Sequence, residues 1–161
     1  MLFRSVGFAV VTIVFVLLAG VTSGFAQTTQ QHVHEMSHDV MPFDMSKTLH
    51  IFRMTEFGGI EQIVVRDPDY RDQIALIRQH LKHEAIKFQH GDYADPIRLH
   101  GANMPGVHEL AQNASQINVS YEELPNGAQL VFKTKGVRLL TAVHRWFGAQ
   151  LSEHGADARA E

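Results

Sequence analysis

Two copies of one local pattern, a β-hairpin followed by an amphipathic helix, constrain the fold of this chain more than any other feature of its sequence. The four β-like runs span 48–54, 60–66, 117–122 and 128–134. The first pair is separated by a turn that contains Gly58-Gly59, and the second by Pro125-Asn126-Gly127. Asn-Gly between alternating apolar residues is a strong hairpin signal. The repeat indicates duplication of a single ββα unit.

An amphipathic helix is expected after each hairpin. The first has Asp67 as its N-cap and Pro68 at its first position, and the second begins near Val137 and stops at Gly155. The apolar stripes are Ile74, Ile77, Leu81, Ala85 and Phe88 in the first helix, and Leu139, Leu140, Val143, Trp146, Phe147 and Leu151 in the second. Between the two units, residues 95–115 predict a short helix, a bend and another helix.

The element order predicts an α+β fold in which the duplicated ββα units form a four-stranded antiparallel sheet with the helices on one face. Alternate residues of the second hairpin supply one apolar core face. The first hairpin is expected to carry a further apolar patch, formed by Leu49, Ile51, Ile63 and Val65. Because large apolar patches are rarely left exposed, we expect the preceding segment or a second subunit of a homodimer to cover it.

The start of the chain has the features of a secretory signal peptide. Residues 1–26 contain a positive charge at Arg4, an apolar run over 6–21, and the small residues of Gly24-Phe25-Ala26 at the cleavage position. These features predict a periplasmic or secreted protein that has no membrane segment after cleavage.

The rest of the chain is expected to divide into a tail and one domain. Residues 27–46 are polar and aperiodic, which is typical of a flexible tail, here rich in His and Met. Residues 47–157 then form a single α+β domain. The formal net charge of −3 and the lack of a basic stripe argue against nucleic-acid binding. The chain has no cysteine, which excludes disulfides, c-type haem attachment and thiolate metal sites.

The available side-chain ligands point to copper. The chain has 11 histidines, 6 methionines and no cysteine, and imidazole with thioether suits copper ions better than Mg²⁺ or Ca²⁺. The densest group of these ligands lies in the tail and comprises His32, His34, Met36, His38, Met41 and Met45. Alternate residues of an extended chain point the same way, so the first four of these side chains are expected to converge on one ion.

Five further candidate metal ligands lie in the folded part, namely His50, His80, His100, Met104 and His144. Met104 precedes Pro105, which disfavours helical backbone at Met104 and removes it from an ordinary helix stripe. The alternative for each residue is structural: a buried histidine bound to backbone, or a methionine that fills a gap in the core. His83 falls nearly opposite the apolar stripe of its helix and is expected to be a solvated surface residue.

Several motifs resemble those of a known family. They are Met41-Pro42-Phe43, Thr48-x-His50-x-Phe52, Gln73-Ile74-x-x-Ile77-Arg78-x-His80-Leu81, Gly91-Asp92-Tyr93-x-x-Pro96, Ile97-x-x-His100-Gly-x-x-Met104-Pro105-Gly106, Tyr121-x-x-Leu124-Pro125-x-Gly127-Ala128 and His144-x-Trp146-Phe147-x-Ala149-Gln150-Leu151-x-x-His154-Gly155. Over 41–157 their order is similar to that of a family of small exported bacterial proteins, often labelled aspartate carbamoyltransferase, that has no established activity. The label would require two α/β domains and a Ser-x-Arg-Thr phosphate loop, and this sequence has neither the length nor the motif. The resemblance favours the five folded-part ligands over His83, His90 and His108.

These features predict a periplasmic metal-binding protein, with copper as its ion, that acts as a buffer, chaperone or resistance accessory beside another periplasmic metal-handling protein. One alternative is a module for non-covalent haem, with His100 or His144 and Met104 as axial ligands. Another is a dimeric interaction protein whose histidines are incidental. An enzyme is not expected, because neither G-x-S-x-G nor H-E-x-x-H is present.

Overall fold

The computed structural model describes residues 28–161, so the signal peptide expected over 1–26 lies outside the described part of the chain. The helices are α1 (Thr29–Met36), α2 (Arg71–Gln89), α3 (Ala94–His100), α4 (Val107–Gln112) and α5 (Val137–His154). The strands are β1 (Thr48–Thr55), β2 (Gly58–Val65), β3 (Ile117–Leu124), β4 (Gly127–Thr134) and β5 (Ala158–Ala160). Over this range no helix combines the length and the apolar character that crossing a membrane requires.

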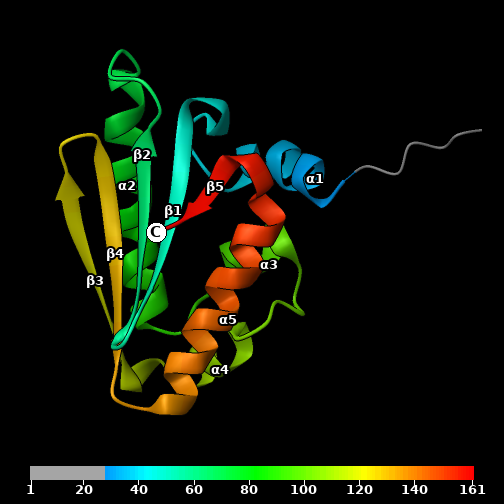
Figure 1. Ribbon diagram of the computed structural model, residues 1–161, viewed down its shortest axis with the longest axis vertical. Helices are drawn as coiled ribbons and strands as arrows, with labels where there is room; N and C mark the ends of the chain where they lie inside the picture. The colour runs from blue at the N-terminus through cyan, green and yellow to red at the C-terminus, as the bar shows by residue number, and fades with distance from the viewer. Residues whose placement is uncertain (1–27) are drawn as a thin grey trace, which may run out of the picture.

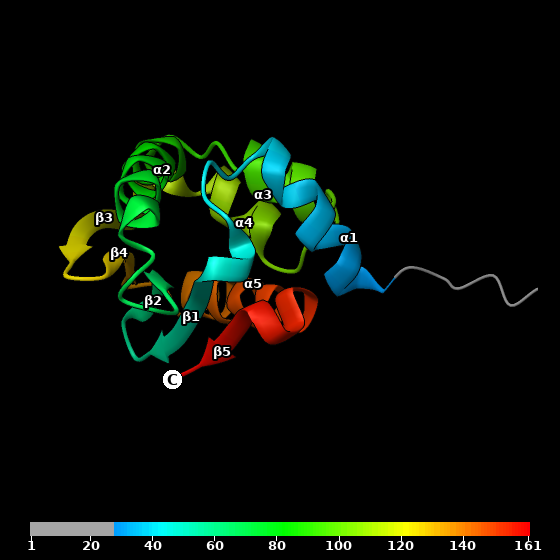
Figure 2. The same ribbon diagram turned by 90° about the horizontal axis from the view of Figure 1, so that it is seen from above.

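The strands form one sheet in the order β3-β4-β2-β1-β5 (Figures 1 and 2). The hairpins β1–β2 and β3–β4 form as expected, and β2 pairs with β4 to join them in an antiparallel arrangement. The additional strand, β5, pairs in parallel with β1. The predicted four-stranded antiparallel sheet is therefore wrong: the protein is α+β, but its sheet is five-stranded and mixed.

The sequence gives no side-chain signal for β5. Ala158-Arg159-Ala160 contains no β-branched or aromatic residue, the types that favour strands. After α5 the chain bends at Gly155, where φ is 53°, and a 3-10 turn over Gly155–Asp157 brings it alongside β1. Backbone pairing with β1 is what makes these residues a strand.

The helices of the described residues lie on one side of the curved sheet, as Figure 2 shows. Between helices and sheet, Trp146 and Phe147 of α5 pack against Phe132 of β4, with ring centroids 5.4 and 5.6 Å from that of Phe132. Phe88 of α2 packs against the same Phe132 ring, 5.9 Å away. These four aromatic side chains are at most 4 % exposed and form the centre of the hydrophobic core.

The two long helices differ in how well the sequence predicted their ends. α5 has the predicted bounds. α2, however, begins at Arg71 rather than at Pro68. The Asp67 carboxylate accepts a hydrogen bond from the Asp69 amide, and the Asp67 carbonyl accepts one from the Tyr70 amide. The expected N-cap is thus used by a separate turn that precedes the helix.

The register of the first hairpin divides the predicted apolar patch between the two faces of the sheet. His50 lies directly opposite Ile63, and opposite residues share a face, so Ile63 and Val65 point toward the helices and are buried in the core. Leu49 and Ile51 lie on the other face, where Ile51 is only 4 % exposed. The turn between β1 and β2 is shorter than predicted, so the two strands pair one residue out of the predicted register. A shift of one residue moves every side chain of a strand to the opposite face of the sheet.

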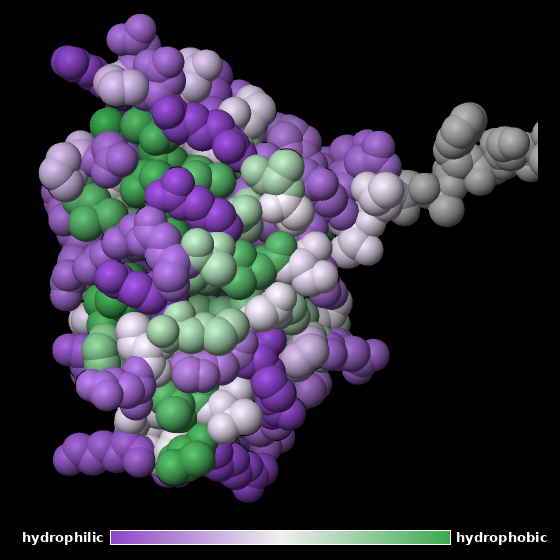
Figure 3. Space-filling view, viewed as in Figure 1, coloured by the Kyte–Doolittle hydropathy of each residue, from purple (hydrophilic) through white to green (hydrophobic). Residues whose placement is uncertain are grey.

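The surface agrees with this division. On the face drawn in Figure 3, apolar side chains form separate groups among polar ones. Among residues 28–161, the exposed large apolar side chains lie on different elements and are Met54, Phe57, Ile86 and Val137. The patch on which the expected homodimer rested is therefore not formed by the described residues.

Residues 28–46 belong to the folded domain and are not the flexible tail that we expected. They form α1 and two 3-10 turns over Ser37–Asp39 and Met45–Lys47. Val33, Phe43 and Met45 are buried, with exposures of 1 %, 2 % and 1 %. These scattered apolar side chains attach the segment to the domain. Because polar residues surround them, the sequence has no regular apolar pattern here that would predict their burial.

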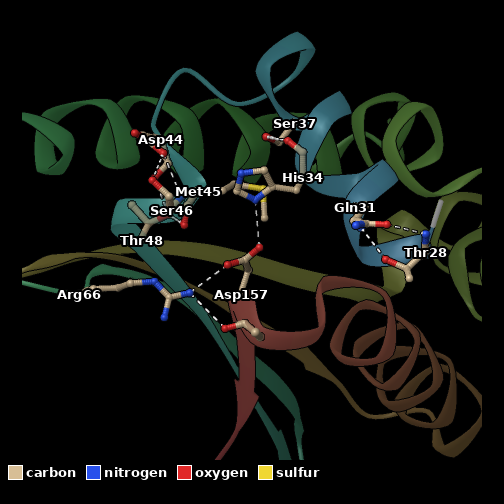
Figure 4. A network of polar contacts seen from close by, with 11 residues as sticks. Thr28, Gln31, His34, Ser37, Asp44, Met45, Ser46, Thr48, Arg66 and Asp157 are labelled. Atoms are coloured by element: carbon tan, nitrogen blue, oxygen red, sulfur yellow. Dashed lines mark hydrogen bonds and ion pairs between the residues drawn. The ribbon is translucent and has the colours of Figure 1, made fainter. Parts of the chain in front are cut away.

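The N-cap of α1 provides a test of this attachment. The Thr28 hydroxyl accepts a hydrogen bond from the Gln31 amide (3.2 Å), and the Gln31 side chain accepts one from the Thr28 amide (2.9 Å; Figure 4). We expect Thr28→Ala to lower the free energy of unfolding by about 1 kcal/mol in a urea titration, because it removes this capping box. Thr29→Ala, at an exposed position of the same helix, is the control. An unchanged midpoint for Thr28→Ala would show that α1 does not contribute to stability.

Candidate functional site

A small, partly enclosed cavity of about 40 Å³ lies between the sheet, α2, α3 and α5, and the segment after α1 lines its remaining side. The polar residues that line it are His50, Glu61, His80, Glu84, Asp95, His100 and Gln150, together with the indole of Trp146. Burying polar groups is unfavourable unless each finds a partner. Their concentration inside a core makes this cavity the candidate functional site.

Four of the predicted ligands meet at this cavity. They are Met41 from the segment after α1, His50 from β1, His80 from α2 and His100 from the end of α3. Each reaches the cavity for a local reason; His50, for example, shares the inner face of β1 with Phe52, two residues away. The four are far apart in the sequence, so only tertiary folding brings them together.

His154, the last residue of α5, belongs to the same cluster although the sequence analysis did not select it. Its ring centroid lies 4.6 Å from that of His50 and 5.0 Å from that of His100. The side chain is 0 % exposed, and neither ring nitrogen has a hydrogen-bond partner within residues 28–161. Its place on the apolar stripe of α5, two helical turns after Phe147, was the signal that it points inward.

Their surroundings keep the buried histidines neutral. Burial lowers the pKa of His50 to about 3 and that of His80 to about 4. Burial also lowers the pKa values of His100 and His154, and the nearby histidines add to the lowering for His154. A neutral imidazole keeps one nitrogen lone pair, which is the form that binds metal ions.

One ring nitrogen of His100 is already engaged. Its Nδ1 lies 2.8 Å from Oε2 of Glu153, and the His100 side chain is 1 % exposed. This contact orients the ring and leaves Nε2 as the nitrogen available to a ligand. His50 differs, because its buried Nδ1 has no hydrogen-bond partner among the described residues.

Carboxyl groups line the cavity beside the histidines. Burial raises the pKa values of Glu61, on β2, and Glu84, on α2, to about 8 in each case, so both are largely protonated at neutral pH. For Asp95 burial acts in the same direction, but hydrogen bonds from Lys87 and Glu84 outweigh it and hold the pKa below its ordinary value. Lys87 Nζ lies 2.6 Å from Asp95 Oδ2 and 3.4 Å from Glu84 Oε1.

Neither glutamate was predicted as a site residue, although each occupies an inward position. Glu61 alternates with Ile63 on the inner face of β2, and Glu84 lies between Leu81 and Phe88 on the buried stripe of α2. An ionisable residue at a core position of a predicted element is a signal of a site, since such residues are almost never fully buried without a partner or a function.

His80 and Asp95 mark the side of the cavity nearest the surface. Together with Val40 they line both the cavity and a pocket on the surface. That pocket also contacts His83, which is exposed, as predicted, and is not among the residues that line the cavity. The cavity and the surface pocket are therefore adjacent and share Val40, His80 and Asp95 as lining residues.

The remaining ligands expected in the tail do not share one direction. His32, His34 and Met36 lie on a helix, where residues two apart point to different sides, and His38 lies in the following 3-10 turn. His34 Nδ1 lies 3.1 Å from Asp157 Oδ2, and Arg66 donates a hydrogen bond of 3.0 Å to Oδ1 of the same carboxylate (Figure 4). His34 thus links α1 to the C-terminal segment.

Three other predicted ligands have structural surroundings. Met45 and Met104 are 1 % and 4 % exposed in the hydrophobic core, and neither lines the cavity. His144 Nε2 lies 3.0 Å from the carbonyl oxygen of Thr55 and 2.9 Å from that of Gly58, where it stabilises the turn of the first hairpin. The structure therefore brings neither Met104 nor His144 to the cavity that His100 lines.

Within residues 28–161, no three histidine, aspartate or glutamate side chains are arranged to hold one metal ion as they stand. The planes of the His50 and His154 rings meet at 23°, so these rings are stacked and do not converge on a common centre. Imidazoles that share an ion have centroids roughly 4.5–5.5 Å apart, given metal–nitrogen distances of about 2.0–2.1 Å. The separations of 4.6 and 5.0 Å fall in this range, so rotation of the rings is the change that metal binding requires.

The volume of the cavity limits its contents. About 40 Å³ has room for an ion or a few water molecules. Pockets for drug-sized or cofactor ligands span roughly 300–1,000 Å³, so a haem does not fit the cavity as it stands.

Comparison with protein-family models, curated proteins and solved structures finds no match for this chain. The function must therefore be argued from the site itself. Neutral imidazoles, one thioether and two protonated carboxyl groups surround one small space. This chemistry is suited to binding a metal ion and to exchanging protons with it.

Proposed function

We propose that this chain is an exported metal-binding protein that holds one copper ion at this partly enclosed cavity. The observation that carries the proposal is the meeting of Met41, His50 and His100 at a space of about 40 Å³. The His154 ring lies beside this space and packs against the rings of both histidines. A thioether beside imidazoles suits copper and is of little use to Mg²⁺ or Ca²⁺.

Each proposed ligand has a distinct role. His50, His100 and His154 supply imidazole nitrogens, and the contact of His100 Nδ1 with Glu153 directs its Nε2 to the ion. Met41 adds a soft ligand that favours the cuprous state. Because the His50 and His154 rings are stacked in the metal-free arrangement, both turn about their side-chain bonds when the ion enters.

The buried carboxyl groups couple copper binding to pH. A cation in the cavity favours ionised Glu61 and Glu84, whose pKa values are raised in its absence. Binding therefore releases protons, and the affinity for copper rises with pH. Loss of a proton from one or both carboxyl groups offsets the positive charge that the ion brings, without placing a permanent anion in the core of the metal-free protein.

The cellular role that fits this site is a copper buffer or chaperone. The ion would pass between His80 and Asp95, which line both the cavity and the surface pocket. Exposed His83 lies at that pocket and offers a first contact for an ion delivered by another periplasmic metal-handling protein.

Copper titration of the full chain, purified without a His-affinity step, tests the proposal. We expect one high-affinity copper ion per chain by elemental analysis after dialysis. Met41→Leu should weaken Cu(I) binding roughly 10- to 100-fold in a competition assay, since it replaces the thioether with an aliphatic side chain of similar volume that cannot bind a metal ion. Zn²⁺ binding, which does not rely on thioether, should change much less.

The matched control is Met36→Leu, because Met36 lies on α1 and does not line the cavity. Equal losses of Cu(I) affinity in the two variants would contradict the assignment of Met41. A parent protein that retains no copper at all would contradict the proposed function.

A further inference from the structure

Three of the four exposed large apolar side chains within residues 28–161 lie at one end of the molecule. Met54, near the end of β1, is 44 % exposed, Phe57, in the turn between β1 and β2, is 37 % exposed, and Val137, the first residue of α5, is 76 % exposed. The β1–β2 turn and the start of α5 both lie at the lower end of the molecule in Figure 1. The Thr134 amide donates a hydrogen bond of 2.9 Å to the Phe57 carbonyl oxygen, which ties the turn to the segment that leads into α5.

Four exposed cations lie beside these apolar side chains, and they are Arg53, Lys133, Lys135 and Arg138. Lys133 Nζ lies 5.6 Å from the centroid of the Phe57 ring, and Lys135 lines the same surface hollow as Phe57. Within residues 28–161 none of the four cations forms an ion pair. Their charges are therefore available to a partner outside the chain.

This end of the molecule is positive although the chain as a whole is acidic, with a formal net charge of −3. Glu56 lies in the same turn as Phe57 and offsets one of the four cations. Glu109 of α4, whose carboxylate lies near Arg138, is already paired with Arg145. An acidic protein with one cationic end turns that end toward an anionic surface.

The surface hollow beside Phe57 is suited to a phosphate group. Besides Phe57 and the two lysines, its lining includes the hydroxyl and amide side chains of Ser115, Gln116, Asn118 and Thr134. The part of the chain that the structure describes contributes no aspartate or glutamate to this hollow. Ammonium, hydroxyl and amide groups all donate hydrogen bonds to phosphate oxygens, so a phosphate can be held here directly beside an apolar ring.

We infer that this end of the protein docks on an anionic lipid membrane, with Met54, Phe57 and Val137 entering the interface while the four cations contact lipid phosphates. The inference goes beyond the proposed function and does not depend on it. Apolar side chains beside clustered lysine and arginine are typical of proteins that bind at the membrane interface without crossing it. Because the Lys133 side chain lies over Phe57, its ammonium group reaches the phosphates while the ring is inserted.

The apolar side chains favour a membrane over a nucleic acid as the partner. A nucleic acid would use the four cations, because phosphate contacts dominate its binding, but it would leave the valine and methionine side chains without a favourable contact. A membrane interface satisfies both kinds of side chain, since charged headgroups and acyl chains lie next to each other there.

Cosedimentation with lipid vesicles tests the inference. The protein is purified after export, its mass is determined so that the ends of the chain are known, and a chelator keeps metal ions out of every sample. The vesicles consist of phosphatidylcholine alone or of phosphatidylcholine mixed with phosphatidylglycerol. At low salt we expect the partition coefficient to be at least about tenfold higher for the anionic vesicles. This preference should be lost at about 1 M salt, where the Debye length is about 3 Å.

Two double variants separate the charged from the apolar contribution. Lys133→Gln with Lys135→Gln should weaken binding to the anionic vesicles about tenfold or more, because each lysine near the surface contributes to the attraction. Phe57→Ser with Val137→Ser should weaken it roughly three- to tenfold, because less apolar surface enters the interface. Thermal unfolding of each variant is measured first. If the apolar double variant does not fold, Val137→Ser alone decides this part of the test, because this side chain is the more exposed of the two.

The matched controls lie on α2. Arg71→Gln with Lys82→Gln removes two exposed cations that likewise form no ion pair within residues 28–161. Ile86→Ser removes the remaining exposed large apolar side chain, which does not line the hollow. Both controls have the same chain ends as the parent protein and should bind the vesicles as the parent does.

Several outcomes would overturn the inference. They are equal binding of the parent to neutral and anionic vesicles, unchanged binding of the lysine variant, and an equal loss in the Arg71 and Lys82 control. Displacement from the vesicles by millimolar glycerol phosphate would show that the hollow holds a free phosphate and not a membrane. A loss in the lysine variant without any loss in the apolar variant would show a surface for a soluble polyanion. None of these results bears on the proposed copper site, because metal ions are excluded from the assay.

Discussion

Replacing His50 and His154 together by leucine is expected to reduce the affinity for copper by more than roughly 100-fold. This loss is larger than the one caused by removing a residue that only hydrogen-bonds to a metal ligand. The same double substitution should leave the metal-free protein at least as stable at acidic pH. The His154 nitrogens and His50 Nδ1 are buried without partners, and replacing such groups by apolar ones of similar volume is neutral or stabilising. Competition titration and urea unfolding at about pH 5 measure the two effects.

The opposite directions of these effects make the test specific. A purely structural role of the two histidines would give a less stable protein whose copper binding falls only as it unfolds. The matched control is the double substitution of His90 and His108, which are exposed at the end of α2 and on α4 and line neither the cavity nor the surface pocket. Equal loss of copper in the control would show that surface histidines, and not the cavity, hold the ion.

Replacing Glu61 by glutamine is expected to change how the stability of the metal-free protein depends on pH. Burial raises the pKa of Glu61 from 4.5 to about 8. The folded protein therefore binds more protons than the unfolded chain between these pH values. The stability that Glu61 contributes is fully present below about pH 4.5 and is lost as the pH rises to about 8.

From about pH 5.5 to about pH 8, the parent protein should lose about 3 kcal/mol of unfolding free energy relative to Glu61→Gln. Buried His50, with its pKa lowered to about 3, acts in the opposite direction below pH 6.5, and comparison with the variant cancels this term. Urea titrations at the two pH values measure the difference. Glu56→Gln, at an exposed position in the first hairpin turn, is the control.

A difference between the parent protein and Glu61→Gln that stays constant over this pH range would mean that Glu61 is ionised or solvated in the folded state. Saturation with copper offers an internal check. If the ion lies beside Glu61, it should reduce the loss of stability at about pH 8, because a cation favours the ionised carboxyl.

The alternation of apolar residues and the Asn-Gly turn predicted the second hairpin, and the apolar stripe of α5 predicted that helix with its bounds. The first hairpin was predicted as well, but with a longer turn and a register shifted by one residue. These are local patterns, and local backbone preferences determine them. The sheet as a whole did not follow from such patterns. β5 has no strand-forming side chains and exists because Gly155 turns the chain toward β1. Likewise, the length of the turn between β1 and β2 sets the register of the first hairpin, and that register points Ile63 toward the core.

Composition alone determined that this chain would offer imidazole and thioether ligands and no thiolate. It could not determine which of those ligands meet. Met104 and His144, which the motifs favoured, are used by the core and by the first hairpin, whereas His154 and Glu61 lie at or beside the cavity without having been selected. The reason is physical: a strand or helix period specifies which side of an element a residue occupies, and only the packing of β1, α2, α3 and α5 specifies which of those sides face one another.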